Sequence, residues 1–173
     1  MTTHRVRSRL RSAAGATAIA LSGLTPLYAS VASHAQGAHP FASFRGRWLG
    51  AGALARDDGS VERLRCQADY RPIQTTRLRL TISCRGDSTN VDLQTDVSES
   101  AGALSGEWIE ANRNIRGDLA GRLTGNSIVA RVAGAGFAAN VSVGVRSNVQ
   151  SVEIRAQGGD ISRLSISLTR SVR

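Results

Sequence analysis

Carboxylates, cysteines and histidines are the side chains of this sequence that could carry out chemistry. Glu107, Glu110 and Asp118 lie close together, and two carboxylates can serve as general acid and general base when they converge within hydrogen-bond reach of a substrate. The strand pattern described below turns Trp108 inward, so that Glu107 points outward. We therefore expect these three carboxylates to be surface charges, and we expect neither an enzyme nor a catalytic residue.

Number and spacing limit what the cysteines and histidines can do. The two cysteines, Cys66 and Cys84, are much farther apart than the Cys-x-x-Cys pairs of redox and metal sites. His39 is the one histidine outside an expected amino-terminal leader, so a zinc or haem site built on histidine is not expected. In an oxidising compartment, an even pair of cysteines is typical of a disulfide. We predict a Cys66–Cys84 bridge, no metal site and no cofactor.

The elements that position these residues are β-strands with alternating apolar residues. From residue 119 to residue 170, consecutive strands keep their apolar residues on one shared face, and the first two are joined by a two-residue turn at Gly125 and Asn126. Longer turns are predicted at 133–136, around 147–148 and at 157–160. The predicted inward pairs include Leu123 with Ile128, Val132 with Phe137, Val145 with Val152, and Val152 with Ile166. Because side chains alternate with a period of two, an error of one residue would turn a whole strand toward water.

Two earlier strands, about 61–70 and 77–85, carry the cysteines. Their inward residues are apolar, and their outward residues are mostly arginine and other polar types. A turn centred on Thr75 places Cys66 directly opposite Cys84 on the inner face. A disulfide there closes a loop of about 20 residues, which the chain-entropy model credits with about 3 kcal/mol of stabilisation.

The predicted fold class is all-β: a single antiparallel meander of about ten strands, closed into a barrel. Closure removes the unpaired edges at which sheets aggregate. An open β-sandwich with the same register is the alternative. An outer-membrane barrel is not expected, because such barrels are apolar outside, whereas the outer face here carries Arg, Asp, Ser and Gln, and aromatic residues make up 4% of the chain.

The first 35 residues have the organisation of a signal peptide. Four arginines between residues 5 and 11 precede an apolar stretch at 13–24, which is too short to span a membrane. Ser33-His34-Ala35 then offers small residues to a signal peptidase. The predicted domains are a signal peptide at 1–35, a flexible lead-in at 36–43 and a β-barrel domain at 44–173. The protein is expected to be periplasmic or secreted.

Charge excludes one class of partner. The formal net charge is +9, and every residue with a permanent positive charge is an arginine. Four of these arginines fall in the predicted signal peptide, so the charge of the remaining domain is moderate and consistent with simple solubility. Nucleic-acid binding would need denser basic clusters and more stacking aromatics. We expect no nucleic-acid partner and, after cleavage, no membrane-spanning segment.

Gly46-Arg47-Trp48 begins the first predicted strand, and Arg170 ends the last one with the inward parity of Leu168. These positions resemble the Gly-x-Trp and the last-strand arginine of calycins, the superfamily of lipocalins and fatty-acid-binding-like barrels. The resemblance implies that Arg170 packs over Trp48 and closes the barrel base, a cation–π contact worth about 0.5–2 kcal/mol. The chain departs from those barrels in having no helical lid. The pattern is also similar to small exported bacterial proteins of unassigned function.

Two functions are compatible with such a barrel. The first is binding of a small hydrophobic ligand inside it, because many inward residues are Gly or Ala and leave space. The predicted lining is Trp48, Tyr70, Leu80, Leu93, Trp108, Phe137 and Val143. The alternative is an envelope interaction protein whose outer arginines bind an anionic glycolipid or polysaccharide. That basic face consists of Arg63, Arg65, Arg77, Arg79 and Arg85.

Overall fold

The computed structural model describes residues 39–134 and 136–171 of the chain. The predicted signal peptide lies outside the described residues. Within them the chain forms ten β-strands and no helix. The strands are β1 (Gly46–Arg56), β2 (Val61–Gln74), β3 (Arg77–Arg85), β4 (Asn90–Ser100), β5 (Ala103–Glu110), β6 (Ile115–Thr124), β7 (Ser127–Gly134), β8 (Phe137–Arg146), β9 (Val149–Gln157) and β10 (Ile161–Arg170).

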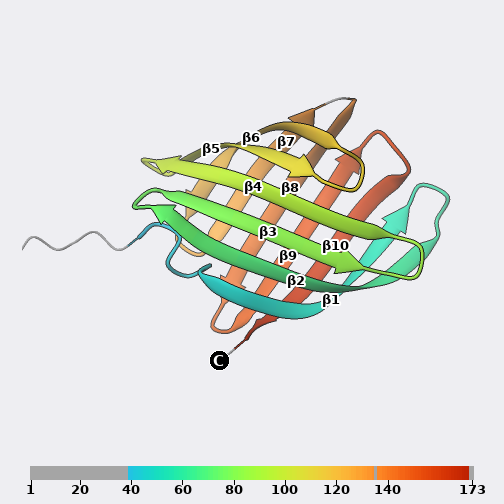
Figure 1. The fold of residues 1–173 in the computed structure, drawn as a ribbon, viewed down its shortest axis with the longest axis horizontal. Coiled ribbons are helices and arrows are strands. Elements are labelled where there is room, and N and C mark those ends of the chain that lie inside the picture. The colour runs from blue at the N-terminus through green and yellow to red at the C-terminus, as the bar shows by residue number, and fades with distance from the viewer. Residues whose placement is uncertain (1–38, 135, 172–173) are drawn as a thin grey trace, which may run out of the picture. The chain divides into compact units, whose positions relative to one another are not determined.

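Each strand pairs antiparallel with its neighbours in sequence, and β1 also pairs with β10 (Figure 1). This last pairing runs from Trp48 opposite Arg170 to Arg56 opposite Ile161, with one irregularity between Ala55 and Arg56. Each described strand therefore has a partner on both sides, and the sheet is a closed barrel. The all-β fold class, the single meander and the barrel closure predicted from the sequence are confirmed, and the open sandwich is excluded.

Glycines allow neighbouring strands to come close at the bends of the barrel. A side-chain carbon built at Gly50 of β1 would collide with the backbone oxygen of Ser167 in β10, and one built at Gly117 of β6 would collide with that of Ala133 in β7. No residue with a side chain fits at either position without moving the backbone. Glycine in a strand permits this close approach of two backbones.

Two hairpins are tighter than the sequence predicted. Gly134 pairs with Phe137 instead of lying in a four-residue turn, and Arg146 pairs with Val149, which brings Gln150 opposite Val145. Positive φ angles at the turn positions Gly136 (78°) and Ser147 (55°) permit such short connections. The predicted pairs Val132 with Phe137 and Val145 with Val152 are therefore wrong by two residues. The faces are unchanged, because a shift of two preserves side-chain alternation.

The described part of the predicted flexible lead-in, from His39 onward, is a turn packed into the barrel. The backbone N–H of Phe44 donates to the carbonyl of Phe41 at 3.0 Å, and both phenylalanine side chains are fully buried. Residues 39–43 of the predicted lead-in therefore form part of this packed turn. Two aromatic side chains three residues apart lie on one side of the turn and fill the end of the barrel.

Candidate functional site

One end of the barrel is filled by a plug, defined here as Phe41, Phe44, Trp48 and Arg170. Trp48 is fully buried, and its indole N–H donates to the carbonyl of Phe44 at 2.8 Å. The Phe44 ring lies 6.0 Å from the ring of Tyr70 on β2. The indole hydrogen bond fixes the Phe41–Phe44 turn to β1, so the aromatic side chains close this end of the interior as one packed unit.

Arg170 completes the plug from the last strand. The centre of its guanidinium lies 4.1 Å from the centroid of the Trp48 ring. The same group donates to the carbonyl of Ser43 at 2.6 Å and to the carbonyl of Arg45. The structure therefore brings together the two residues that the sequence predicted to close the barrel, and it adds two backbone acceptors that the sequence did not indicate.

A hydrogen bond crosses the interior beside the plug. The hydroxyl of Tyr70 on β2 donates to Oε1 of Gln150 on β9 at 3.0 Å, and both side chains are buried. Burial raises the pKa of the Tyr70 phenol far above its usual value, which outweighs the opposite effect of the bond to Gln150. The phenol therefore stays protonated, and it serves as a hydrogen-bond donor rather than as a base.

The interior is packed less completely against β6 and β7 than against the strands around β1. The inward residues of β1, β2 and β10 include a series of almost fully buried apolar side chains. In contrast, every inward residue of β6 is only half-buried, as are three of the four on β7. We call these residues the half-buried wall: Ile115, Gly117, Leu119, Gly121, Leu123, Ile128, Val132 and Gly134.

The predicted lining residues divide between the packed side and the open side of the interior. Trp48 belongs to the plug, Tyr70 forms the hydrogen bond beside the plug, and Val143 is buried. Leu80, Leu93 and Phe137 are half-buried and are candidates for contact with a ligand. Trp108 is 6% exposed and contacts Phe137 edge-on, with ring centroids 5.8 Å apart. Sequence reasoning missed Phe41, Gln150 and most of the half-buried wall.

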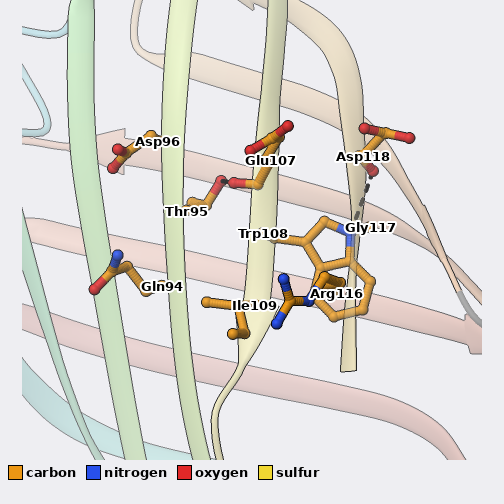
Figure 2. Close-up of a pocket in the computed structure, with 9 residues that line it drawn as sticks. All are labelled: Gln94, Thr95, Asp96, Glu107, Trp108, Ile109, Arg116, Gly117 and Asp118. Carbon is orange, nitrogen blue, oxygen red and sulfur yellow. Dashed lines mark hydrogen bonds between the residues drawn. The ribbon is translucent and has the colours of Figure 1, made fainter. Parts of the chain in front are cut away.

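Trp108 on β5 stands directly opposite Gly117 on β6. Its indole N–H donates to the carbonyl of Asp118 at 3.2 Å, as Figure 2 shows. An aromatic ring opposite a strand glycine compensates for the missing side chain. This contact explains why Trp108 and Gly117 occur as cross-strand partners.

Two grooves lie on the outer face of the barrel. The first, of about 490 Å³, runs between two rows of outward side chains (Figure 2). One row is Asp96, Glu107 and Asp118, and the other is Gln94, Ile109 and Arg116. The second groove, of about 740 Å³, crosses β8, β9, β10 and β1 over small outward residues, including Ser142, Ser151, Ser167 and Ala51. Neither groove is the interior chamber that the sequence predicted.

The three carboxylates considered for catalysis differ in exposure. Glu107 and Asp118 are exposed, as predicted. Glu110 is only 7% exposed, so its prediction as a surface charge was wrong. Its carboxylate accepts backbone N–H groups from Asp92 at 2.9 Å and Arg113 at 2.8 Å. Burial alone would raise the pKa of Glu110, but these donors outweigh burial and hold the pKa below its usual value. Glu110 therefore fixes the β5–β6 turn as a carboxylate.

Glu62 has the same role at the β3–β4 turn. Its carboxylate accepts from the hydroxyl of Thr89 at 2.6 Å, and from the backbone N–H and the hydroxyl of Ser88 at 2.7 and 2.8 Å. Arg56 forms an ion pair with the same carboxylate at 3.2 Å. The hydrogen bond from Thr89, followed by those from Ser88, lowers the pKa of Glu62 to about 2. The side chain ties β2 to a turn that begins more than twenty residues later.

The Glu62 network predicts a pH dependence of stability. A pKa of about 2 in the folded protein, against an ordinary value of 4.5, means that Glu62 stabilises the fold above pH 4.5 and that this stabilisation is lost as the pH falls toward 2. Glu62→Gln is expected to lower the melting temperature at pH 7, and the difference from the wild type should disappear by about pH 2. Thermal unfolding followed by circular dichroism measures both.

The exposed Glu107→Gln variant is the matched control, because the Glu107 carboxylate forms no hydrogen bond within the described residues. If the difference in melting temperature between the wild type and Glu62→Gln stays constant from pH 7 to pH 2, the role assigned to Glu62 is contradicted.

The predicted basic face is partly neutralised. Arg79 forms two hydrogen bonds of 2.7 Å with Asp96, and Arg85 forms two of 2.8 Å with Asp92. Arg65 stands opposite Arg85, as predicted. In the part of the chain that the structure describes, no ion pair joins Arg63, Arg65 or Arg77 to a carboxylate. Exposed pairs of this kind add little stability, and binding of an anionic envelope surface stays a prediction.

The predicted disulfide is confirmed. Cys66 and Cys84 are bonded and directly opposite in the β2–β3 ladder, with their Cα atoms 4.1 Å apart. Both residues are buried on the inner face. Within residues 39–134 and 136–171, no group of three or more acidic, cysteine or histidine side chains could hold a metal ion. Among the same residues, no helix has the length and apolarity needed to cross a membrane.

Comparison with known proteins identifies the fold. The sequence matches no protein-family profile and no curated protein. The structure is similar to that of Rv2717c from M. tuberculosis, with a TM-score of 0.61, 16% identity, and coverage of 76% of this chain and 95% of that one. It is also similar to the S-type phycobiliprotein lyase CPES from Guillardia theta, with a TM-score of 0.57, 9% identity, and coverage of 77% and 91%. The chain has a calycin-like barrel fold.

Proposed function

We propose that this protein is an exported, non-enzymatic binding protein that holds a small apolar ligand inside its barrel. The observation that carries the proposal is the half-buried wall. Its side chains face the interior of a closed barrel and are apolar or glycine, yet they are not covered as the core around β1 is. An apolar ligand between this wall and Leu93 and Phe137 would remove that surface from water, at roughly 25 cal/mol for each Å² buried.

The interior polar groups support binding rather than catalysis. The Thr95 hydroxyl is buried and donates to the carbonyl of Glu107 at 2.7 Å. Glu62 and Glu110 each accept a backbone N–H from the turn that they fix. Tyr70 stays protonated. Because a general base needs a free, titratable acceptor in reach of its substrate, these groups are suited to maintaining the fold.

Two further observations support export and ligand binding. Disulfides persist mainly in oxidising compartments such as the periplasm and the exterior of the cell, and the barrel contains one. One of the barrels with the same fold is named as a phycobiliprotein lyase. Since one fold hosts many functions, this likeness adds less support than the half-buried wall does.

Blocking the interior tests the proposal. Leu119→Trp places a larger side chain on the half-buried wall, and Ala120→Trp places the same side chain on the exposed outer face one residue later. Nile red, a neutral apolar dye, should bind the wild type and Ala120→Trp with equal affinity. Leu119→Trp is expected to bind the dye at least about tenfold more weakly, because the added ring occupies space that the dye needs. A tenfold weaker affinity corresponds to about 1.4 kcal/mol of binding free energy. Fluorescence titration measures all three.

Native mass spectrometry of protein recovered from the periplasm provides an independent measurement. An additional mass that is lost on denaturation would support the proposal and identify the class of ligand. If the wild type binds no Nile red and carries no additional mass, or if both tryptophan variants bind equally well, the proposed function is wrong.

A further inference from the structure

The outer face above the seam between β1 and β10 carries no charge in its middle. In three consecutive cross-strand rows, the outward residues of these two strands are apolar or carry a hydroxyl group. We call this surface, with its continuation on β9, the serine face: Leu49, Ala51, Ala53, Val149, Ser151, Ser165, Ser167 and Thr169. Most of these side chains are short, so another flat surface can approach this part of the sheet closely.

Two observations indicate that the serine face is a contact surface. Its short side chains leave the groove of about 740 Å³ that crosses β8, β9, β10 and β1. At one end of the face, two large apolar side chains stay exposed, Leu49 (46%) and Val149 (45%). A partner that covered this end would remove their apolar surface from water.

Opposite charges border the serine face. One cross-strand row runs from Arg63 on β2 through Ala53 and Ser165 to Glu153 on β9. Arg63 and Glu153 therefore lie at equal distances on the two sides of the seam, and both line the groove. A partner of a single charge sign, such as an anionic bilayer, would be attracted by Arg63 and repelled by Glu153. A second copy of this chain supplies both signs in the matching order.

A two-fold axis determines which residues of two such copies meet. When the axis lies between the two faces, parallel to the strands and above the seam, β1 of one copy lies over β10 of the other, and β2 lies over β9. Arg63 then meets Glu153 of the second copy, and symmetry repeats this contact. In the next row, Arg65 meets Ser151 of the second copy. Like charges do not meet in either row.

The contacts that Glu153 makes within its own chain are compatible with this arrangement. Its carboxylate lies 2.6 Å from Arg155 and 3.8 Å from Arg163, in both cases through Oε1. Oε2 can therefore accept from a further arginine while the first contacts remain. The groove gives the side chain of that arginine room beside Glu153, because the intervening residues of β10 and β1 are short.

We propose that two copies of the chain associate through the serine face about this two-fold axis, in a weak dimer with two reciprocal Arg63–Glu153 ion pairs. Exposed ion pairs contribute little individually, and small interfaces of this kind are typical of transient association. The dimer covers the seam at which the barrel closes. All of these residues point outward, so the inference is independent of the ligand proposed for the interior.

A charge swap tests the dimer, with sedimentation velocity of the purified protein from about 1 µM to about 1 mM as the measurement. The wild type should dimerise within this range. Arg63→Glu and Glu153→Arg should each weaken dimerisation at least about tenfold, because symmetry turns one reversed charge into two repulsive contacts. The double variant Arg63→Glu/Glu153→Arg should return to within about threefold of the wild type, because opposite charges meet again.

Arg122→Glu is the matched control. It makes the same change of charge at an exposed position of β6, which lies opposite β1 in the closed strand order, and it should dimerise as the wild type does. Circular dichroism checks that each variant is folded, and Arg63→Glu compared with Arg122→Glu decides the question if Glu153→Arg does not fold. A wild type that stays monomeric overturns the proposal. Single variants that dimerise normally, or a folded double variant as weak as the single ones, overturn it as well.

Discussion

Phe44→Ala is expected to lower the free energy of unfolding by about 3–5 kcal/mol, the usual cost of removing a fully buried phenylalanine ring. Phe44 is fully buried, its ring packs against Tyr70, and its carbonyl holds the indole of Trp48. Because a domain of this size is stable by only about 5–15 kcal/mol, this change removes a large share of the total. Urea unfolding at neutral pH, followed by tryptophan fluorescence, measures it.

Phe137→Ala is the matched control for this prediction. Phe137 is the same residue type and faces the same interior, but it is half-buried and packs against Trp108 away from the plug. Since less of its surface leaves water on folding, we expect a loss of about half that of Phe44→Ala. Equal losses in the two variants would show that the plug contributes no more than any other part of the interior.

Replacing both cysteines by alanine is expected to lower the free energy of unfolding by about 3 kcal/mol or more. The bridge joins residues 18 apart in sequence, and most of its stabilisation comes from restricting the unfolded chain. Both sulfurs are on the buried inner face, so the double variant also leaves a small cavity, which adds to the loss. Urea unfolding of the wild type and of Cys66→Ala/Cys84→Ala, compared under oxidising conditions, gives the difference.

Reduction of the bridge separates the effect of the bond from that of the cavity. A reductant present throughout unfolding should destabilise the wild type by nearly the amount found for the double variant, and it should leave the double variant unchanged. If the double variant loses less than about 1 kcal/mol, the bridge does not provide the stabilisation that the entropy model credits to it.

Side-chain alternation made the barrel predictable from the sequence. Runs such as Leu64, Cys66 and Ala68 show which face is inward without any knowledge of the partner strand. The position of Cys66 opposite Cys84 followed from placing one turn at Thr75. The pairing of Trp48 with Arg170 followed from a resemblance to calycins at the two ends of the barrel, which is information that alternation does not contain.

Alternation shows which face of a strand points inward, but a register shift of two residues leaves that face unchanged. The pairing of two hairpins was predicted wrongly for this reason. Gly134 was assigned to a turn, because glycine is common there, and the turn around 147–148 was predicted too long, which left Gln150 outside the strand. Glycine also fits where two backbones nearly touch, and glutamine also fits a buried position when one partner is present. Local composition does not distinguish these cases, so Gln150 was missed as an interior residue.

Phe41 was missed for a different reason. It lies outside any alternating run, directly after Pro40, so that no periodic signal indicates burial. Only the closed end of the barrel provides a place for it, and that end is assembled from strands distant in sequence. The half-buried wall is likewise a property of the packed interior, because the same alternating pattern describes a filled strand and an unfilled one.

A hydrogen bond joins Arg170 to the carbonyl of Ser43, 127 residues earlier in the chain, so the last strand holds the first in place. As the chain emerges during synthesis, β1 presents an unpaired edge and an uncovered indole until β10 arrives. Contacts this distant in sequence slow folding, and an open edge invites pairing with other chains. A chain that lacks its last strand would therefore keep the edge of β1 unpaired. Whether it aggregates would depend on how quickly that edge met another molecule.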